Sequence, residues 1–264
     1  MSVCLLVIDP QNDFVNSSGA LSVKGADKDM ERLAKMVDKH GDVIDDIQIS
    51  LDSHFLIHIS HPFWWQNSSG KPPSPFTLIS VEDVEKGIWR PKNPEWKDWA
   101  LEYVTTLRNN GKYVLCIWPP HCIIGSVGAA IYPTFYDAVS RWESKYFAIA
   151  PRTTKGSNPF TEHYSIVKAD CPRADDSGTR LNGKLVRTLQ QYDTILISGE
   201  ALSHCVASTV QDIAAEFSPD QVKKFVLLED ASSSVTGFEA QGKQFVDDMV
   251  KKGMQIAKTD TFFK

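Results

Sequence analysis

Apolar and polar positions are arranged along the chain in two ways that predict different elements. Residues Val3 to Asp9 are almost entirely apolar and end at Pro10, which predicts a buried strand. From Lys28 to His40 the apolar residues recur every three or four positions, which is typical of a helix with one buried face. The same reasoning predicts strands at Asp46 to Leu51, Tyr113 to Trp118, Asp193 to Ser198 and Lys224 to Leu228, and helices at Pro94 to Arg108, Cys205 to Phe217 and Phe238 to Lys252.

Strands and helices that alternate in this way predict an α/β protein built from βαβ units around a mostly parallel sheet. In such sheets the binding site lies outside the carboxyl ends of the strands. Polar or reactive residues occur at these points after four predicted strands, namely Asp9, Asp52, His121 and Cys205. We therefore take these four as the first candidates for function.

Residues 62–92 interrupt the alternation of strands and helices. They are rich in proline, serine and aromatic residues and have little periodicity. This predicts an insertion-like loop within one domain, residues 1–264, because the sheet pattern resumes after it. The aromatic residues of the insertion are Phe63, Trp64, Trp65 and Trp89. A lid over a pocket, an oligomer contact and a local cluster on an exterior loop are all open interpretations of them.

Composition narrows the class of protein. The 264 residues include 28 Lys and Arg against 33 Asp and Glu, and the net charge of -5 argues against a nucleic-acid-binding surface. The longest apolar runs are far shorter than the ~20 residues that cross a bilayer, and we expect neither membrane insertion nor a signal peptide. Five widely spaced cysteines do not resemble a disulfide framework, so a reduced, cytoplasmic compartment is expected.

Cys205 lies where a predicted strand turns into a predicted helix. Backbone N–H groups at a helix start stabilise a thiolate and bind an oxyanion, which favours a nucleophile. A buried filler, a redox thiol and a metal ligand remain alternatives, although the chain has no C-x-x-C motif. His204 is adjacent in sequence but points in another direction, so His163 and Asp9 are the freer candidates for a proton acceptor.

A metal site is predicted by the segment LDSH and the later segment WPPHC. Asp52 and His54 are two positions apart at a strand end, and both side chains therefore point to the same side. With His121 they form a set that suits zinc or iron and leaves coordination positions open. His58, His61 and Cys122 compete as ligands, and loop-capping histidines near prolines are the ordinary alternative.

Five segments, in this order, resemble the motifs of the nicotinamidase branch of the isochorismatase-like cysteine hydrolases. They are VIDPQNDF, LDSHFLIHIS, WPPHC, KGSNPFTEHYS and GEALSHCV. The resemblance implies a three-layer α/β/α fold over the whole chain apart from the insertion. It also implies Asp9 as base, Lys155 as the partner of both reacting groups, and Cys205 as nucleophile.

The resemblance extends to supporting residues. It implies Asp52, His54 and His121 as metal ligands, with His58 and Ser60 around them. It further implies a cis peptide between Glu200 and Ala201, oxyanion donors at the N–H groups of Ala201 and Cys205, and Phe14 and Trp118 flanking a substrate ring. The sequence departs from the family pattern at Asn158, His163, His61, Leu202 and Ser203.

The function implied by the resemblance is hydrolysis of nicotinamide to nicotinate and ammonia through a Cys205 thioester. Another small amide or an N-carbamoyl compound is the alternative substrate class, and an interaction scaffold without turnover is the alternative to an enzyme. The implied cofactor is a divalent metal ion, with zinc first and iron or manganese as alternatives. A homo-oligomer and a place in NAD salvage are also expected from the resemblance.

Overall fold

The centre of the molecule is a six-stranded sheet in which every neighbouring pair of strands is parallel. The structure, a computed structural model, describes residues 2–264. The strand order is β10-β9-β8-β1-β2-β7. The bounds are β1 Val3–Ile8, β2 Asp46–Asp52, β7 Arg152–Lys155, β8 Thr194–Gly199, β9 Phe225–Leu228 and β10 Gln255–Ala257.

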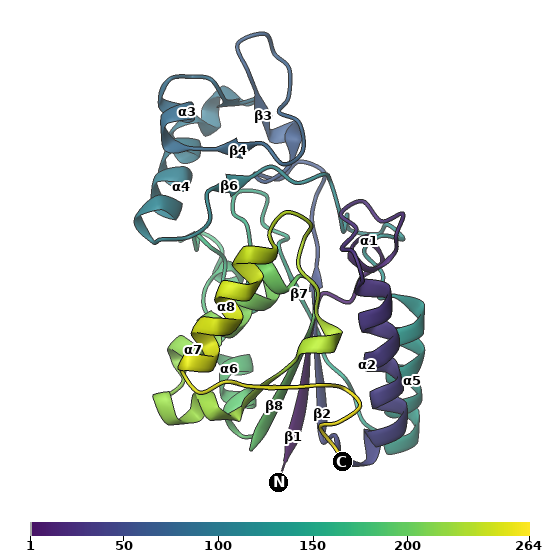
Figure 1. The fold of residues 1–264 in the computed structure, drawn as a ribbon. Helices are drawn as coiled ribbons and strands as arrows, with labels where there is room; N and C mark the ends of the chain where they lie inside the picture. The colour runs from purple at the N-terminus through teal and green to yellow at the C-terminus, as the bar shows by residue number, and fades with distance from the viewer. Residues whose placement is uncertain (1) are drawn as a thin grey trace.

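Helices cover both faces of this sheet, and Figure 1 shows the resulting three layers. One face carries α2 (Ala26–His40) and α5 (Pro133–Tyr146), which pack against each other. The other face carries α6 (Gly183–Gln190), α7 (Ala207–Glu216) and α8 (Glu239–Lys251). Because the sheet is buried on both faces, β1 and β8 are apolar runs with every residue buried. The predicted three-layer α/β fold is confirmed.

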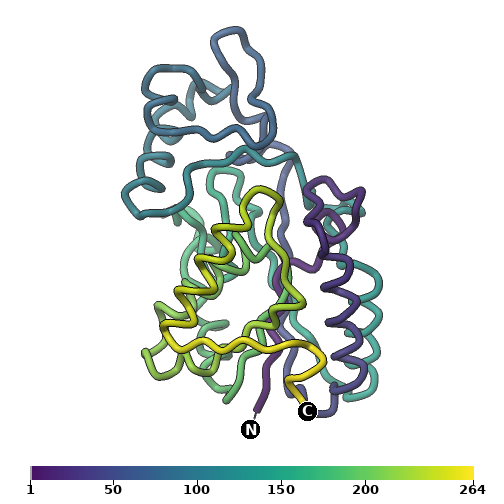
Figure 2. Tube along the Cα trace, in the orientation of Figure 1, coloured from purple at the N-terminus to yellow at the C-terminus, as the bar shows by residue number. Residues whose placement is uncertain are grey.

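Residues 62–118, which we call the cap, stand over the carboxyl ends of the strands (Figures 1 and 2). The cap has its own buried apolar cluster, in which Trp64, Trp65 and Tyr103 are almost fully enclosed. Its short elements are β3 Trp65–Gln66, β4 Leu78–Ile79, α3 Val81–Glu85, β5 Arg90–Pro91, α4 Lys97–Asn109 and β6 Leu115–Cys116. The stretch 62–92, expected as a loop, thus contains five short elements, four of them named above and one a 3-10 turn at Pro62–Trp64.

One strand assignment from the sequence is wrong. Tyr113 to Trp118 does not join the central sheet, because only Leu115–Cys116 is extended and it pairs antiparallel with Leu78–Ile79. Leu115 and Ile117 pack into the apolar cluster of the cap, so their burial has a different origin from that of β1. The place beside β2 is taken by β7, which the apolar pattern did not predict.

The remaining chain connects these parts without adding another layer. A four-residue helix, α1 (Asn12–Val15), follows β1 and contacts the start of α2. Both ends of the chain lie at the side of the molecule opposite the cap (Figure 2). Among the helices within residues 2–264, none has both the length and the apolar character needed to span a membrane.

Packing in the cap cluster predicts that two neighbouring aromatic residues contribute differently to the free energy of unfolding. The Trp64 side chain is fully buried, stacks on Trp96 with ring centroids 4.2 Å apart and meets Phe160 edge-on at 5.1 Å. Trp64→Ala should therefore lower the free energy of unfolding by about 3–5 kcal/mol, measured by urea denaturation. Phe63, which is 43% exposed, is the control, and Phe63→Ala should cost about 0.5 kcal/mol or less. Equal losses in the two variants would contradict the role given to Trp64.

Candidate functional site

Four neighbouring strands bring four reactive side chains together at the carboxyl end of the central sheet. Cys205 follows β8, Asp9 follows β1, Asp52 is the last residue of β2 and Lys155 is the last residue of β7. Asp52 and Lys155 are direct partners in the register of β2 and β7. Parallel strands that end together thus assemble residues from positions 9 to 205, in the crevice where α/β proteins bind ligands.

Lys155 is the centre of this group. Its Nζ lies 2.8 Å from Asp9 Oδ2, 3.1 Å from Asp52 Oδ1 and 3.5 Å from Cys205 Sγ. The Ser50 hydroxyl donates to Asp9 Oδ1 at 2.5 Å and accepts from the Asp9 N–H at 3.0 Å. All five residues are buried, so the ammonium of Lys155 and the two carboxylates find their partners in one another.

The pKa values of these groups move in different directions. Burial raises the pKa of the Cys205 thiol well above its usual range and outweighs the lowering effect of Lys155. Burial also raises the pKa of Asp9, against Lys155. For Lys155, burial would lower the pKa, but the carboxylates of Asp52 and Asp9 outweigh it and raise the pKa well above its usual range. The resting site therefore pairs a charged lysine with a neutral thiol.

Asp52 also faces two histidines. Asp52 Oδ2 lies 2.9 Å from His54 Nε2 and 3.3 Å from His121 Nε2. In each imidazole Nδ1 lies beside a backbone carbonyl, that of Gly156 at 3.0 Å for His54 and that of Pro119 at 2.8 Å for His121. A carbonyl only accepts, so Nδ1 carries a proton in both rings, and Nε2 is the ring nitrogen that can bind an ion beside the carboxylate. The donor set Asp52, His54 and His121 fits a divalent transition metal ion.

Two further histidines pack around this set. The ring of His58 lies 4.4 Å from that of His54, and its Nδ1 is 2.8 Å from the Ser60 hydroxyl. The ring of His61 lies 5.3 Å from His54 and 5.4 Å from His121. His58 and His61 are fully buried. His58, Ser60 and His61 therefore lie next to the ligand set that the sequence predicted.

A small apolar cavity opens beside Cys205 and Asp52. Its walls include Phe14, Trp118, Tyr164, His204, Ala201 and Val235. The indole N–H of Trp118 donates to the Tyr164 hydroxyl at 2.8 Å, and the ring of Phe14 meets His121 edge-on at 5.4 Å. The cavity measures about 20 Å³, which is room for about one water molecule.

The turn that carries the cysteine differs from the one expected. The cis peptide between Glu200 and Ala201, expected from the resemblance, is present. Cys205 does not begin a helix, as predicted for Cys205 to Phe217, but lies in a five-residue π turn, Leu202–Val206, that precedes α7. The Ala201 carbonyl accepts from the N–H groups of His204 and Val206, which fixes the turn around the thiol.

The chain was compared with known proteins. No family model matches the sequence. It is 26% identical to the nicotinamidase of Escherichia coli strain K12 over 212 residues, covering 79% of this chain and 74% of the relative. The structure aligns with yeast nicotinamidase bound to the inhibitor nicotinaldehyde (TM-score 0.68, 18% identity, 97% and 99% coverage) and with Pyrococcus horikoshii pyrazinamidase in complex with zinc (TM-score 0.57, 19% identity, 98% and 99% coverage).

The chain has the nicotinamidase fold. Together with the sequence match, this supports the nicotinamidase and pyrazinamidase branch of the isochorismatase-like cysteine hydrolases, the family that the motifs resemble.

Two residues of the nicotinamidase-like motif VIDPQNDF have positions that sequence reasoning missed. The Gln11 side chain donates to the Asp52 carbonyl at 2.7 Å and accepts from the Asp52 N–H at 2.6 Å. Asp13 accepts from the Cys122 N–H at 2.7 Å, directly after His121. Both therefore position metal-ligand candidates, and no spacing rule would have found them, since each partner lies far away in sequence.

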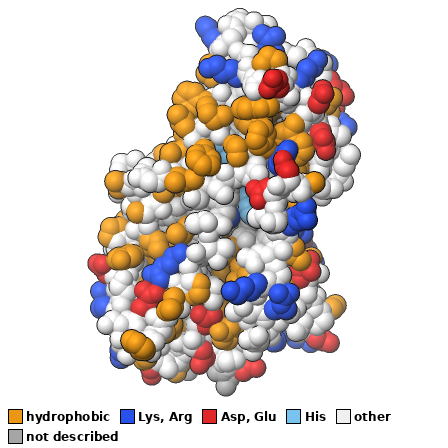
Figure 3. Space-filling model, turned by 180° about the vertical axis from the view of Figure 1, so that it is seen from behind, with side chains coloured by type: hydrophobic (Ala, Val, Ile, Leu, Met, Phe, Trp, Pro, Cys, Tyr) orange, Lys and Arg blue, Asp and Glu red, His pale blue; other side chains and the backbone are white. Residues whose placement is uncertain are grey.

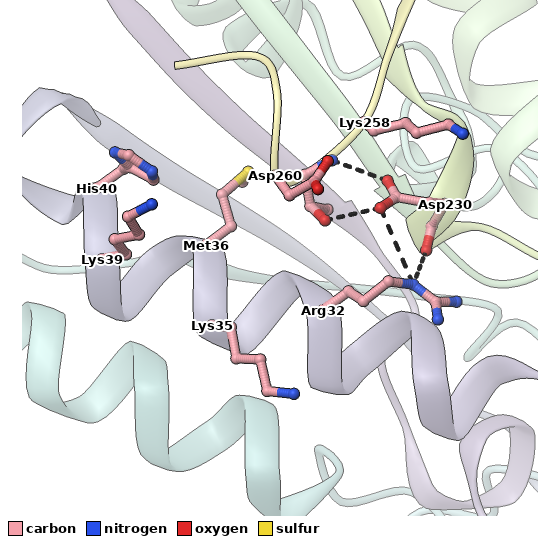
Figure 4. A pocket seen from close by; sticks show the side chains of 9 residues that line it. Arg32, Lys35, Met36, Lys39, His40, Asp230, Lys258 and Asp260 are labelled. Atoms are coloured by element: carbon pink, nitrogen blue, oxygen red, sulfur yellow. Dashed lines mark hydrogen bonds and ion pairs between the residues drawn. The ribbon is translucent and has the colours of Figure 1, made fainter. Parts of the chain in front are cut away.

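A larger groove, of about 410 Å³, lies on another part of the surface (Figure 4). It is lined by side chains of α2, including Arg32, Lys35 and Lys39, and by Asp230 and Lys258 from the C-terminal part of the chain. None of the site residues expected for a nicotinamidase lines this groove. Size therefore does not identify the site, whereas the converging chemistry beside Cys205 does.

Gly156 predicts how tightly the ligand set is packed. A Cβ at this position would lie 2.6 Å from His54 Cε1 and 2.9 Å from Asp52 Oδ1, and φ is +82°. Gly156→Ala should reduce metal content per chain, measured by elemental analysis, because His54 and Asp52 must shift. Gly87 is the control, since its φ is +68° and nothing lies within 4 Å of its added Cβ. Both variants should lose about 1–2 kcal/mol from backbone strain, and equal metal content in the two would contradict the prediction.

Proposed function

We propose that this protein is a metal-containing cysteine amidohydrolase that converts nicotinamide and water to nicotinate and ammonia. The observation that carries the proposal is the Lys155 ammonium, buried 2.8 Å from the Asp9 carboxylate and 3.5 Å from the Cys205 sulfur. Neutral thiols are poor nucleophiles, and this arrangement provides a proton acceptor and a cation for one. The sequence match to a nicotinamidase favours the same substrate class.

In the first half-reaction, Asp9 accepts the thiol proton as the Cys205 sulfur attacks the amide carbon. Lys155 stabilises the negative charge, which lies on the Asp9 carboxylate before the proton transfer and on the Cys205 sulfur after it. The C–N bond breaks, the proton moves from Asp9 to the leaving nitrogen, and ammonia departs from a thioester. The N–H groups of Ala201 and Cys205 are the proposed donors to the oxyanion, because both belong to the turn around the thiol.

In the second half-reaction, Asp9 takes a proton from water, and the water oxygen attacks the thioester carbon. The C–S bond breaks, nicotinate is released, and the proton returns to the sulfur. The Ser50 hydroxyl remains hydrogen-bonded to Asp9 and keeps its carboxylate oriented toward Lys155. Asp9 therefore acts as the base in both half-reactions.

The metal ion would be held by Asp52, His54 and His121, with His58 and Ser60 supporting them. When bound, it supplies a Lewis acid that orients the pyridine nitrogen or the waters around it. We propose zinc, the ion bound by the Pyrococcus horikoshii relative, with iron and manganese as alternatives that elemental analysis of the purified protein distinguishes.

The wider setting follows from this proposal. Phe14 and Trp118 would flank the substrate ring, since both are walls of the cavity beside Cys205.

We also propose that residues 1–264 act as one domain. The protein would work in the cytoplasm, in NAD salvage, and would assemble as a homo-oligomer. Apolar side chains gathered where the cap joins the sheet domain favour such an assembly (Figure 3).

The role of Cys205 predicts a specific loss of activity. Cys205→Ala should reduce ammonia release from nicotinamide by about 10³-fold or more, because no thioester forms. Cys171→Ala is the matched control, since this thiol is also buried but belongs to the cap cluster, and it should retain activity. Both variants should keep the wild-type metal content.

Other outcomes redirect or refute the proposal. Ammonia release from another small amide or an N-carbamoyl compound, but not from nicotinamide, would keep the thioester chemistry and replace the substrate. Full activity of Cys205→Ala would refute the mechanism. A metal-loaded wild type without hydrolysis of any small amide would favour an interaction scaffold.

A further inference from the structure

A second group of ligand atoms lies next to the proposed metal site. His54, His58 and Glu162 each offer one ligand atom, and these atoms all lie within 4.8 Å of one another. All three residues are buried. Within residues 2–264, His58 Nε2 and Glu162 Oε2 have no hydrogen-bond partner. Buried polar atoms are rarely left in this state, which points to a bound group that satisfies them.

The contacts of these residues engage one polar atom of each side chain. The Glu162 Oε1 atom accepts from the His163 N–H at 2.8 Å, which leaves Oε2 free. His58 Nδ1 lies 2.8 Å from the Ser60 hydroxyl and accepts from the Ser60 backbone N–H at 3.3 Å. Binding of an ion at Nε2 requires the other tautomer, in which Nδ1 donates to the Ser60 hydroxyl. Such outer contacts are the usual way in which proteins fix the orientation of metal-binding imidazoles and carboxylates.

His54 belongs to both groups of ligand atoms. We call Asp52, His54 and His121 seat one, and His54, His58 and Glu162 seat two. The Nδ1 of His54 lies 3.0 Å from the Gly156 carbonyl and therefore carries the proton, so Nε2 is its single free ligand atom. One lone pair binds one ion, and the two seats must compete for it.

We propose that seat two binds a divalent transition metal ion in alternation with seat one. Two imidazoles and one carboxylate form a donor set that suits zinc, cobalt or iron. His61 adds a further nitrogen, because its buried Nε2 has no hydrogen-bond partner among residues 2–264, and its ring lies 5.2 Å from His58 and 5.3 Å from His54.

An ion in seat two leaves Asp52 and His121 without it, and these two residues line the cavity beside Cys205 together with Glu162 of seat two. Occupancy of seat two therefore moves the ion to another wall of the same cavity, away from the seat one ligands that would position the substrate, and lowers turnover. This consequence rests on the proposed amide hydrolysis, whereas the binding of an ion to seat two does not.

The test is a titration of metal-free protein with Co²⁺, followed by visible absorption. His121→Ala removes a ligand of seat one only, and this variant should still bind about one Co²⁺ per chain, with a spectrum different from that of the wild type. Adding Glu162→Gln should then weaken Co²⁺ binding at least tenfold. In the wild-type background the same change should alter affinity less than threefold, because seat one is intact.

A matched control uses another buried acid. Asp170 also has a carboxylate oxygen without a partner among the described residues, but it belongs to neither seat. Asp170→Asn in the His121→Ala background should leave Co²⁺ affinity unchanged. Circular dichroism and thermal unfolding verify that each variant folds, and His58→Gln replaces Glu162→Gln if the latter does not.

Three results would overturn the proposal. They are no Co²⁺ binding by folded His121→Ala, binding by that variant that neither Glu162→Gln nor His58→Gln weakens, and two Co²⁺ ions bound together by the wild type. All are measured without substrate, so a failure to hydrolyse nicotinamide would count against the proposed function alone.

Discussion

The ion pairing of one buried lysine determines how the rest of this site is built. A buried ammonium is costly unless anions surround it, and Lys155 has the carboxylates of Asp9 and Asp52 at 2.8 and 3.1 Å. These anions are placed by β1 and β2, and the lysine by β7, so the order of the strands is a condition for the pairing. The thiol of Cys205, carried by the turn after β8, lies in the same charged environment.

The site also requires the cap to pack against the end of the sheet. The last strand of the cap, β6, leads to Trp118 and His121. The backbone N–H of Trp118 donates to the Ser60 carbonyl at 2.7 Å. His54 forms a β-bridge with Ile123, which fastens the segment that follows the cap beside the ligands. The four neighbouring histidines, His54, His58, His61 and His121, therefore lie where the main core and the cap cluster meet, and neither cluster alone would bring them together.

The sequence predicted the parts of this structure that are determined locally. β1, β8 and β9 are buried on both faces, and their continuous apolar runs reveal them. β7 has the sequence RTTK and lies at the edge of the sheet, partly exposed, so no apolar pattern marked it. Tyr113 to Trp118 has a strand-like pattern, but Leu115 and Ile117 pack in the cap cluster, whereas Cys116 and Trp118 belong to the main core. The alternation therefore reflects a segment between two apolar clusters and not a strand of the central sheet.

The same distinction applies to the site. Asp9, Asp52 and Cys205 follow strands and were found from position, whereas Lys155 was found only through the resemblance of its motif. Glu162 was not found, because its neighbourhood depends on how the segment after β7 folds back onto His54 and His58. Contacts between distant segments are properties of the fold, which no single stretch of sequence contains.

A double-mutant cycle between Lys155 and Asp9 tests the central claim most directly, with the free energy of unfolding of metal-free protein measured in urea. Lys155→Met should cost about 3–5 kcal/mol in the wild type, because it leaves buried carboxylates unpaired. In the Asp9→Asn background the same change should cost less by about 1 kcal/mol or more, because one of those carboxylates is gone. Costs that are equal in the two backgrounds would show that the lysine does not hold Asp9, and would contradict this account of the site.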